Sequence, residues 1–109
     1  MGHYEILVHE AARADIRGIV GYIARDLREP NTARAMSKRL QDAILSLGNM
    51  PERFPLVSDK YLASLGLRTT SVGNYLIFYI VNPEGHRVDI FRVLYGKRDW
   101  IRILTESND

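Results

Sequence analysis

The stretch NYLIFYIVNPEGHRVDIFRVLYGKRDW, residues Asn74–Trp100, decides the fold. It contains two apolar runs rich in β-branched and aromatic residues, Tyr75–Val81 and Val88–Tyr95, joined by Asn82-Pro83-Glu84-Gly85. Such runs have high strand propensity, and Pro-Glu-Gly suits a turn. We therefore expect an antiparallel hairpin at the centre of a small sheet. Because the first run carries no charge, we expect both of its faces to be covered.

The composition indicates one globular domain. The chain has 109 residues, of which 46% are hydrophobic, and its formal charge is +2. That size predicts a single domain over 1–109, with an ordered core at 4–104 and a polar, frayed tail at 105–109. No stretch is long and apolar enough to span a membrane, and the start lacks the pattern of a secretion signal, so we expect a cytoplasmic protein. The absence of cysteine excludes disulfides and thiolate metal ligands.

Two helices are predicted upstream of the hairpin. Apolar residues recur at three- and four-residue spacing over Glu10–Arg28 and again over Thr32–Leu47. Between them, Glu29-Pro30-Asn31 interrupts the pattern, and Asn31 is expected to cap the second helix. Because the connection is so short, the two helices should form an antiparallel helical hairpin.

The remaining segments complete a four-stranded sheet. Strands are predicted at Tyr4–His9 and Leu67–Val72, an irregular segment at Met50–Ser64, and a short helix or turn at Asp99–Leu104. The expected fold class is α+β, in the order β-α-α-β-β-β. The helical hairpin packs on one face of a small, mainly antiparallel sheet, and a short C-terminal helix follows.

Strand alternation assigns the central run to two faces. Tyr75, Ile77, Tyr79 and Val81 share one face, which we expect to contact the helical hairpin. Leu76, Phe78 and Ile80 then point to the opposite face. Part of the cover for that face is expected from Trp100, Ile101, Ile103 and Leu104, and the rest from a partner protein.

Three segments together resemble the RelE/ParE superfamily of toxins from type II toxin–antitoxin pairs. They are A-x-x-D-I-x-x-I-x-x-Y-I from Ala12, G-L-R-x-x-x-V-G-N-Y-L-I-F-Y over Gly66–Tyr79, and V-D-I-F-R-V-L-Y-G-K-R-D-W over Val88–Trp100. The resemblance extends from Tyr4 to Leu104. It implies a growth-inhibiting toxin of the plasmid-stabilisation or stress-response type. It also implies a ParD-like or other antitoxin that wraps a flexible segment over the toxin and forms a hetero-oligomer with it.

The superfamily contains two activities. RelE-like members cut messenger RNA on the ribosome, with lysines and arginines on the open sheet face and a tyrosine or histidine near the C-terminus. ParE-like members poison DNA gyrase by binding. Where the RelE pattern carries an arginine after Tyr75, this chain has Leu76, and Trp100–Leu104 contains neither tyrosine nor histidine. The residues favour a ParE-like gyrase inhibitor, with a RelE-like, metal-independent and ribosome-dependent endoribonuclease as the alternative.

The resemblance supplies candidate residues for each role. A gyrase inhibitor needs no catalytic residue of its own. An RNase would use Arg68, Tyr95, Lys97 and Arg98. Binding of the target or of nucleic acid is assigned to Arg92, Lys97, Arg98 and Arg102. Antitoxin binding is assigned to Leu76, Phe78, Ile80 and Trp100.

Structural roles compete with these assignments. Arg92, expected on the face of Val88, Ile90 and Leu94, is as well explained by an ion pair or a carbonyl contact. Arg68 is as well explained by an exposed structural charge, and Tyr95 by a packed aromatic ring. The histidines show no metal-ligand spacing, so no metal and no cofactor are expected.

Overall fold

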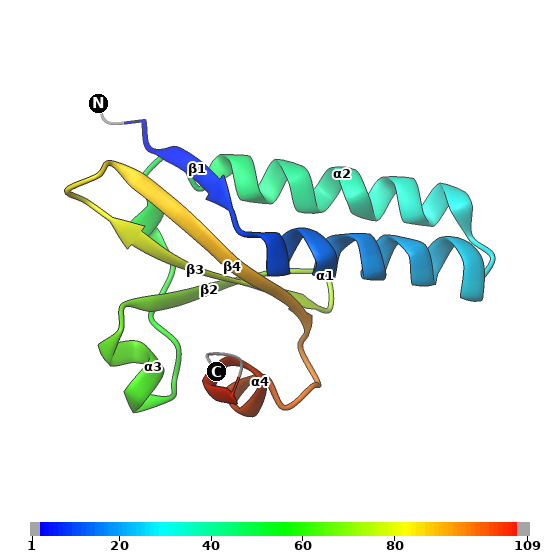
Figure 1. Cartoon of the computed structure of the whole chain (residues 1–109). Helices are drawn as coiled ribbons and strands as arrows, with labels where there is room; N and C mark the ends of the chain where they lie inside the picture. Colours follow the sequence, from blue (N-terminus) through cyan, green and yellow to red (C-terminus); the bar gives the residue numbers. More distant parts are fainter. Residues whose placement is uncertain (1–2, 107–109) are drawn as a thin grey trace.

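The computed structural model describes residues 3–106, which form one four-stranded sheet with helices on both faces (Figure 1). The elements are β1 (Glu5–Val8), α1 (Glu10–Gly21), the π-helical segment η1 (Tyr22–Asp26), α2 (Pro30–Ser46), the 3₁₀ turn η2 (Pro51–Arg53), α3 (Lys60–Ser64), β2 (Leu67–Val72), β3 (Tyr75–Asn82), β4 (Arg87–Tyr95) and α4 (Trp100–Glu106). The α+β class and the order of the principal elements are those predicted from the sequence.

The sheet has the strand order β1-β4-β3-β2. Strands β2, β3 and β4 form an antiparallel meander, in which Tyr75 lies opposite Tyr95 and Asn82 opposite Arg87. Strand β1 pairs with β4 in parallel, and only over Arg87–Ile90. The central hairpin expected from the apolar runs is therefore confirmed, and β4 is left without a neighbour on its outer side beyond Ile90.

The helical hairpin of α1 and α2 lies across one face of the sheet (Figure 1). The first helix does not run regularly to Arg28, because it changes to π-helical geometry at Tyr22, whose carbonyl accepts a hydrogen bond from the Leu27 N–H. The second helix begins at Pro30 and not at Thr32, since proline has no N–H to leave unsatisfied at a first helical position. Asn31 is consequently inside the first turn, and the predicted Asn31 cap is wrong.

Two short elements were not predicted. The segment expected to be irregular, Met50–Ser64, contains η2 and α3. The carboxylate of Asp59 caps α3 by accepting a hydrogen bond from the Leu62 N–H at 3.0 Å. At the other end of the chain, α4 continues to Glu106, so the first two residues of the expected tail are helical. Residues 107–109 of that tail lie outside the described residues.

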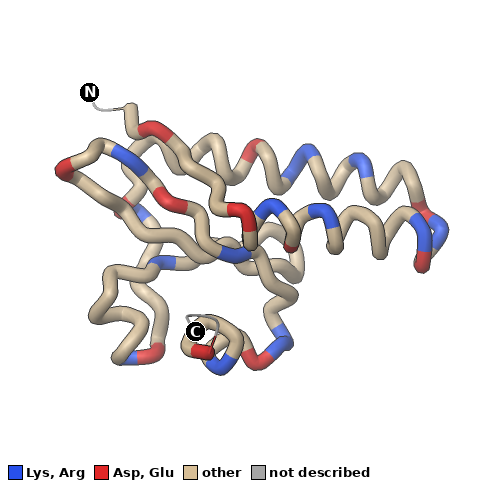
Figure 2. Tube along the Cα trace, viewed as in Figure 1, with Lys and Arg blue, Asp and Glu red and all other residues tan. Residues whose placement is uncertain are grey.

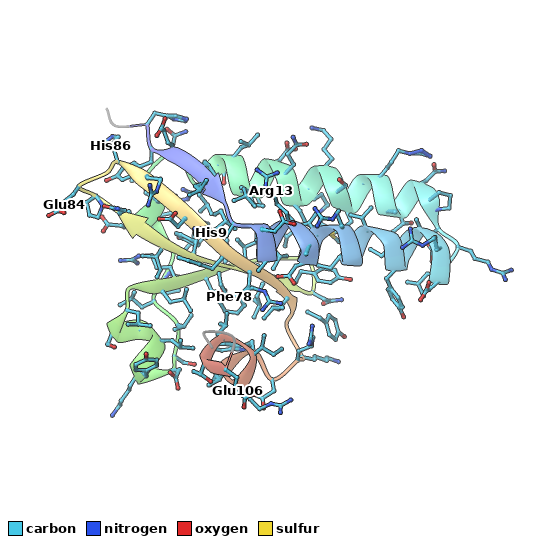
Figure 3. All side chains as sticks on the ribbon, in the orientation of Figure 1. His9, Arg13, Phe78, Glu84, His86 and Glu106 are labelled. Carbon is cyan, nitrogen blue, oxygen red and sulfur yellow. The ribbon has the colours of Figure 1, made fainter. Side chains whose placement is uncertain are left out.

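Each face of β3 has its own hydrophobic core. Ile77 and Tyr79 are fully buried against α1 and α2, as the alternation predicts. Phe78 is also fully buried, on the opposite face, where α3 and α4 cover it. The rings of Phe78 and Trp100 are 5.2 Å apart, and Phe78 lies between the sheet and α4 in Figure 3. The chain itself therefore covers Phe78 completely, whereas Leu76 and Ile80 on the same face remain half-buried.

A β-bulge in β4 changes the face of Arg92. Phe78 pairs with Arg92 and Tyr79 pairs with Ile90, so Phe91 is an extra residue. The bulge reverses the alternation: Ile90 and Val93 belong to the core under the helices, whereas Leu94 belongs to the other core. The predicted common face of Val88, Ile90, Arg92 and Leu94 is therefore wrong.

Truncation of Phe78 tests the second core. Phe78→Ala should lower the free energy of unfolding by about 3 to 5 kcal/mol, because it leaves a cavity beneath α4. The matched control Leu45→Ala removes a side chain that is 56% exposed and should change stability by less than about 0.5 kcal/mol. Urea denaturation followed by circular dichroism measures both. Equal effects would show that α4 does not cover this face in solution.

Tyr79 should make the fold sensitive to alkaline pH. Burial raises the pKa of Tyr79 from 10.0 to about 12, although Arg68 and Arg53 oppose the change, and the hydroxyl donates a 2.7 Å hydrogen bond to the Pro51 carbonyl. The folded state therefore favours the protonated phenol. Its contribution is complete below pH 10 and should be lost, by about 2 kcal/mol, as the pH rises from 10 to 12. Urea denaturation at several pH values should show that the free energy of unfolding falls more steeply between pH 10 and 12 for the wild type than for Tyr79→Phe.

Candidate functional site

Arg68 holds a loop. Its Nη1 donates hydrogen bonds to the carbonyl oxygens of Phe54 at 2.6 Å and Glu52 at 3.3 Å. Arg68 lies opposite Tyr79 on the neighbouring strand, and the Tyr79 hydroxyl donates a hydrogen bond to the Pro51 carbonyl of η2. The two side chains therefore attach the same segment to the sheet. The geometry is that of a structural cation, one of the two alternatives left open by the sequence.

Arg92 is held in an ion pair with Asp15 of α1. Its Nε and Nη2 donate to the two carboxylate oxygens at 2.7 Å and 2.9 Å, and the Val93 N–H donates to the same carboxylate at 2.9 Å. The side chains of Arg92 and Asp15 are only 20% and 12% exposed. The hydrogen bonds that Arg92 donates to Asp15 raise the pKa of Arg92 above its usual value, so this guanidinium stays charged and paired.

The remaining basic candidates lie at the end of β4 and on α4. Lys97 and Arg98 are exposed in the turn after Tyr95, which begins where the Gly96 N–H donates to the Asn74 carbonyl at 2.8 Å. Arg102 is exposed on α4, 3.8 Å from the carboxylate of Asp99. In Figure 2 the basic positions of this turn and of α4 alternate with acidic ones. The segment is therefore a cationic but mixed surface.

The structure does not bring the RNase candidates together. Arg68 lies opposite Tyr79, and Tyr95 lies opposite Tyr75, so the two are separated by four residues along β3. At the rise of a strand that is roughly 13 Å. The Arg68 guanidinium is moreover bound to the Phe54 and Glu52 carbonyls, so it does not form a phosphate site with Tyr95 in this arrangement. Tyr95, Lys97 and Arg98 are neighbours in the chain, whereas Arg68 belongs to another part of the sheet.

The antitoxin candidates surround α4. Leu76, Ile80 and Trp100 are half-buried, while Phe78 has no exposed surface. A ligand that contacts Phe78 would have to displace the α4 cover first. The other three side chains present their outer parts at the edge of that cover.

An apolar groove lies beside these residues, next to Ile80 and the start of the helical hairpin, where the resemblance leads us to expect the antitoxin segment. It has a volume of about 470 Å³ and lies between the start of α1, the sheet, α3 and α4. Its lining includes His9, Leu65, Ile80 and Phe91. The groove depends on α3 and on the bulge at Phe91, and neither has a periodic signature in the sequence.

A buried carboxylate stands beside the groove. Asp89 is 7% exposed and contacts His9 Nε2 at 3.0 Å and Arg87 Nε at 3.2 Å. The His9 ring stacks on Phe91 at 4.4 Å, at the junction of β1 and α1 (Figure 3). These contacts fix the start of α1 against β4. Within residues 3–106, no cluster of histidine and carboxylate side chains has the arrangement of a metal site.

Removal of the Asp15 carboxylate tests the structural role of Arg92. Asp15→Ala should destabilise the fold by about 3 kcal/mol, because it leaves the Arg92 guanidinium and the Val93 N–H without their acceptor. Glu10→Ala breaks the exposed Arg17 pair on the same helix and should cost less than about 1 kcal/mol. Urea denaturation measures the difference, and equal losses would contradict this role for Asp15.

The fold is similar to several solved toxin structures. The chromosomal ParDE toxin–antitoxin system from P. aeruginosa gives a TM-score of 0.73 at 15% identity, covering 89% of this chain and 100% of that one. The RelBE2 toxin–antitoxin complex from Mycobacterium tuberculosis gives 0.61 at 23% identity, with coverages of 87% and 93%. The archaeal RelE–RelB complex from Pyrococcus horikoshii gives 0.60 at 17% identity, with coverages of 88% and 98%.

The sequence itself gives a more specific result than these structural likenesses. No curated protein sequence is significantly similar to the chain. Among the described residues, no helix has both the length and the apolar character needed to cross a membrane. The family model of the ParE toxin of the type II toxin–antitoxin system, parDE, matches residues 6–100. Since that match spans most of the sequence, the chain belongs to the ParE family of type II toxins.

Proposed function

We propose that this toxin inhibits DNA gyrase by binding to it, and that a cognate antitoxin neutralises it. The observation that carries the proposal is the dispersal of the cations that RNA cleavage would need. Metal-free cleavage requires a base for the 2′-hydroxyl, cations around the phosphate and an acid for the leaving oxygen, all within reach of one phosphate.

The groups that such a site needs are not assembled on the described part of this sheet. Arg68 is bound to main-chain carbonyls, and Arg92 is neutralised by Asp15. Between them, the middle of β3 presents Leu76 and the buried Phe78 beneath Trp100. Tyr95 is the phenol nearest to the exposed Lys97 and Arg98, but it stands at the far end of the strand from Arg68. This arrangement supports a protein that acts through its surface.

The cations that remain exposed suit a binding role. Lys97, Arg98 and Arg102 project from the last turn and from α4, where charged groups add to the rate and specificity of association with an acidic partner. A poison of this kind needs higher affinity for the gyrase state in which DNA is cut and not resealed than for other states. No bond chemistry by the toxin is required.

A cognate antitoxin is the second partner in this proposal. The structurally similar ParDE and RelBE2 proteins are described as a toxin–antitoxin system and a toxin–antitoxin complex. For this chain, an amphipathic antitoxin segment would contact the exposed parts of Leu76, Ile80 and Trp100 and extend toward the apolar groove. Folding of such a segment on the toxin exchanges ordering entropy for a large buried area.

The test combines purified toxin with gyrase, plasmid DNA and ATP. We expect inhibition of supercoiling together with accumulation of cleaved DNA. Replacing Lys97, Arg98 and Arg102 by alanine should raise the toxin concentration for half-inhibition about tenfold, because charged contacts are lost at the interface. The control replaces Arg34 and Lys38, which are exposed on α2 away from that surface, and should leave inhibition unchanged.

Translating ribosomes provide the opposing assay. The wild-type toxin should leave messenger RNA intact under conditions that stop supercoiling. Messenger RNA cleavage that Arg98→Ala abolishes, with no effect of the toxin on gyrase, would replace this proposal by the endoribonuclease alternative.

A further inference from the structure

Three tyrosines from different elements gather at the end of the sheet where α1 finishes. The rings of Tyr75 on β3 and Tyr95 on β4 meet edge to face, with their centroids 5.9 Å apart. Tyr22 opens η1, the segment that follows α1. Burial raises the pKa of Tyr75, and the Tyr22 and Tyr95 phenols raise it further, which is consistent with Tyr22 lying near this pair. The three side chains therefore form one surface, which we call the tyrosine cluster.

The tyrosine cluster is exposed at both sides. Tyr22 is 51% exposed and Tyr95 is 38% exposed, whereas Tyr75 is half-buried between them. Tyr22 opens the π-helical segment, and the extra residue in that turn alters the direction of the helix face at this position. Such π segments occur frequently at functional sites. Because the exposed rings of Tyr22 and Tyr95 contribute little to the core, folding stability does not account for aromatic residues at these two positions.

Unpaired cations surround the tyrosine cluster. Six basic side chains have no hydrogen-bond or ion-pair partner within residues 3–106: Arg25, Arg28, Arg39, Lys60, Lys97 and Arg98. Four of these six are close to the cluster in the chain or in space. Arg25 folds back over Gly21, next to Tyr22, and the Arg39 guanidinium lies over Gly73, two residues before Tyr75. Lys97 and Arg98 follow Tyr95 in the adjoining turn.

The acidic groups nearby do not cancel this charge. Asp99 is directed into α4, where its carboxylate accepts from the Arg102 N–H at 3.3 Å and lies 3.8 Å from the Arg102 Nε. Asp15 is occupied by Arg92 and Val93. Asp26, one turn beyond Tyr22, is an exposed carboxylate of η1, and its single negative charge is set against Arg25 immediately before it and Arg28 two residues after it.

The geometry points to a contact with single-stranded nucleic acid at the tyrosine cluster, with bases stacked on Tyr22 and Tyr95 and phosphates bound by Arg39, Lys97 and Arg98. Exposed aromatic rings bordered by cations that track a backbone are the general means of binding unpaired strands without sequence preference. Arginine also adds cation–π attraction to a stacked ring. This inference deepens the proposed function, on which it rests, because a poison of cleaved DNA would meet unpaired nucleotides at the target.

Binding is measured on nucleic acid alone, without gyrase, so that its failure is separate from failure of gyrase inhibition. The probes are fluorescein-labelled oligothymidylate and oligouridylate of equal length, followed by fluorescence anisotropy at low and at moderate salt. Saturable binding that weakens with salt is expected. Tighter binding of oligothymidylate is expected, because the proposed target is cleaved DNA, and tighter binding of oligouridylate would overturn the inference.

Matched variants separate stacking from general surface effects. Tyr22→Ala and Tyr95→Ala should each weaken binding at least about fivefold, while Tyr95→Phe should retain it, because the ring and not the hydroxyl does the stacking. The control is Tyr61→Ala on α3, a tyrosine that is 59% exposed but lies outside the tyrosine cluster, and it should bind as the wild type does. Lys97→Gln should reduce the salt dependence, whereas Lys60→Gln should not.

A measurement on the unmodified protein covers the case in which a variant does not fold. Photo-crosslinking of a bromodeoxyuridine oligonucleotide should yield crosslinked peptides that contain Tyr22 or Tyr95. Absence of saturable binding, equal losses for Tyr61→Ala, or crosslinks confined to other peptides would overturn the inference. So would loss of gyrase inhibition in the Tyr22 and Tyr95 variants with unchanged oligonucleotide binding, which would assign the cluster to a protein contact.

Discussion

The Asp15 carboxylate closes an edge that the sheet leaves open. Strand β1 covers β4 only as far as Ile90, so the following main-chain groups of β4 face α1 and not another strand. Asp15 accepts the Val93 N–H and, at the same time, both donors of Arg92. A buried N–H without an acceptor costs about 1 to 3 kcal/mol, and an unpaired guanidinium costs more. One side chain thus fixes the helical hairpin to the sheet and satisfies the bulged part of β4.

That contact also limits the chemistry available to the sheet. The bulge turns Arg92 away from the face that alternation would give it, and Asp15 then neutralises it. Phe78, which lies opposite Arg92 in the register, is buried beneath Trp100. Arg92 therefore serves the fold at the edge of the sheet, and apolar side chains cover the middle of β3. Among the described residues, the basic side chains without partners lie in turns and on the surfaces of helices.

The sequence was sufficient for features that repeat over many residues. The uncharged run Tyr75–Val81 predicted the central strand and the division of its side chains between two faces, since each added residue supports the same alternation. Features that depend on one residue could not be predicted. The extra Phe91, the π turn at Tyr22 and the five-residue helix α3 each arise from local packing and have no repeat to reveal them. Arg92 was for this reason assigned to the wrong face, and the walls that α3 and Phe91 give the apolar groove were not predicted.

Binding and catalysis place different demands on the side chains of a surface. A catalytic constellation must be held within about 0.5 Å of its productive geometry by side chains that are themselves locked in place. The side chains of Lys97 and Arg98 lie in an exposed turn without partners among the described residues, and Arg102 has only a loose, solvated pair with Asp99. Long-range attraction to an acidic partner tolerates that freedom, because it depends on net charge and not on the position of one atom. Arg68 and Arg92, which are held in place, stabilise the fold. The side chains of Lys97 and Arg98 are exposed and remain available for the proposed binding.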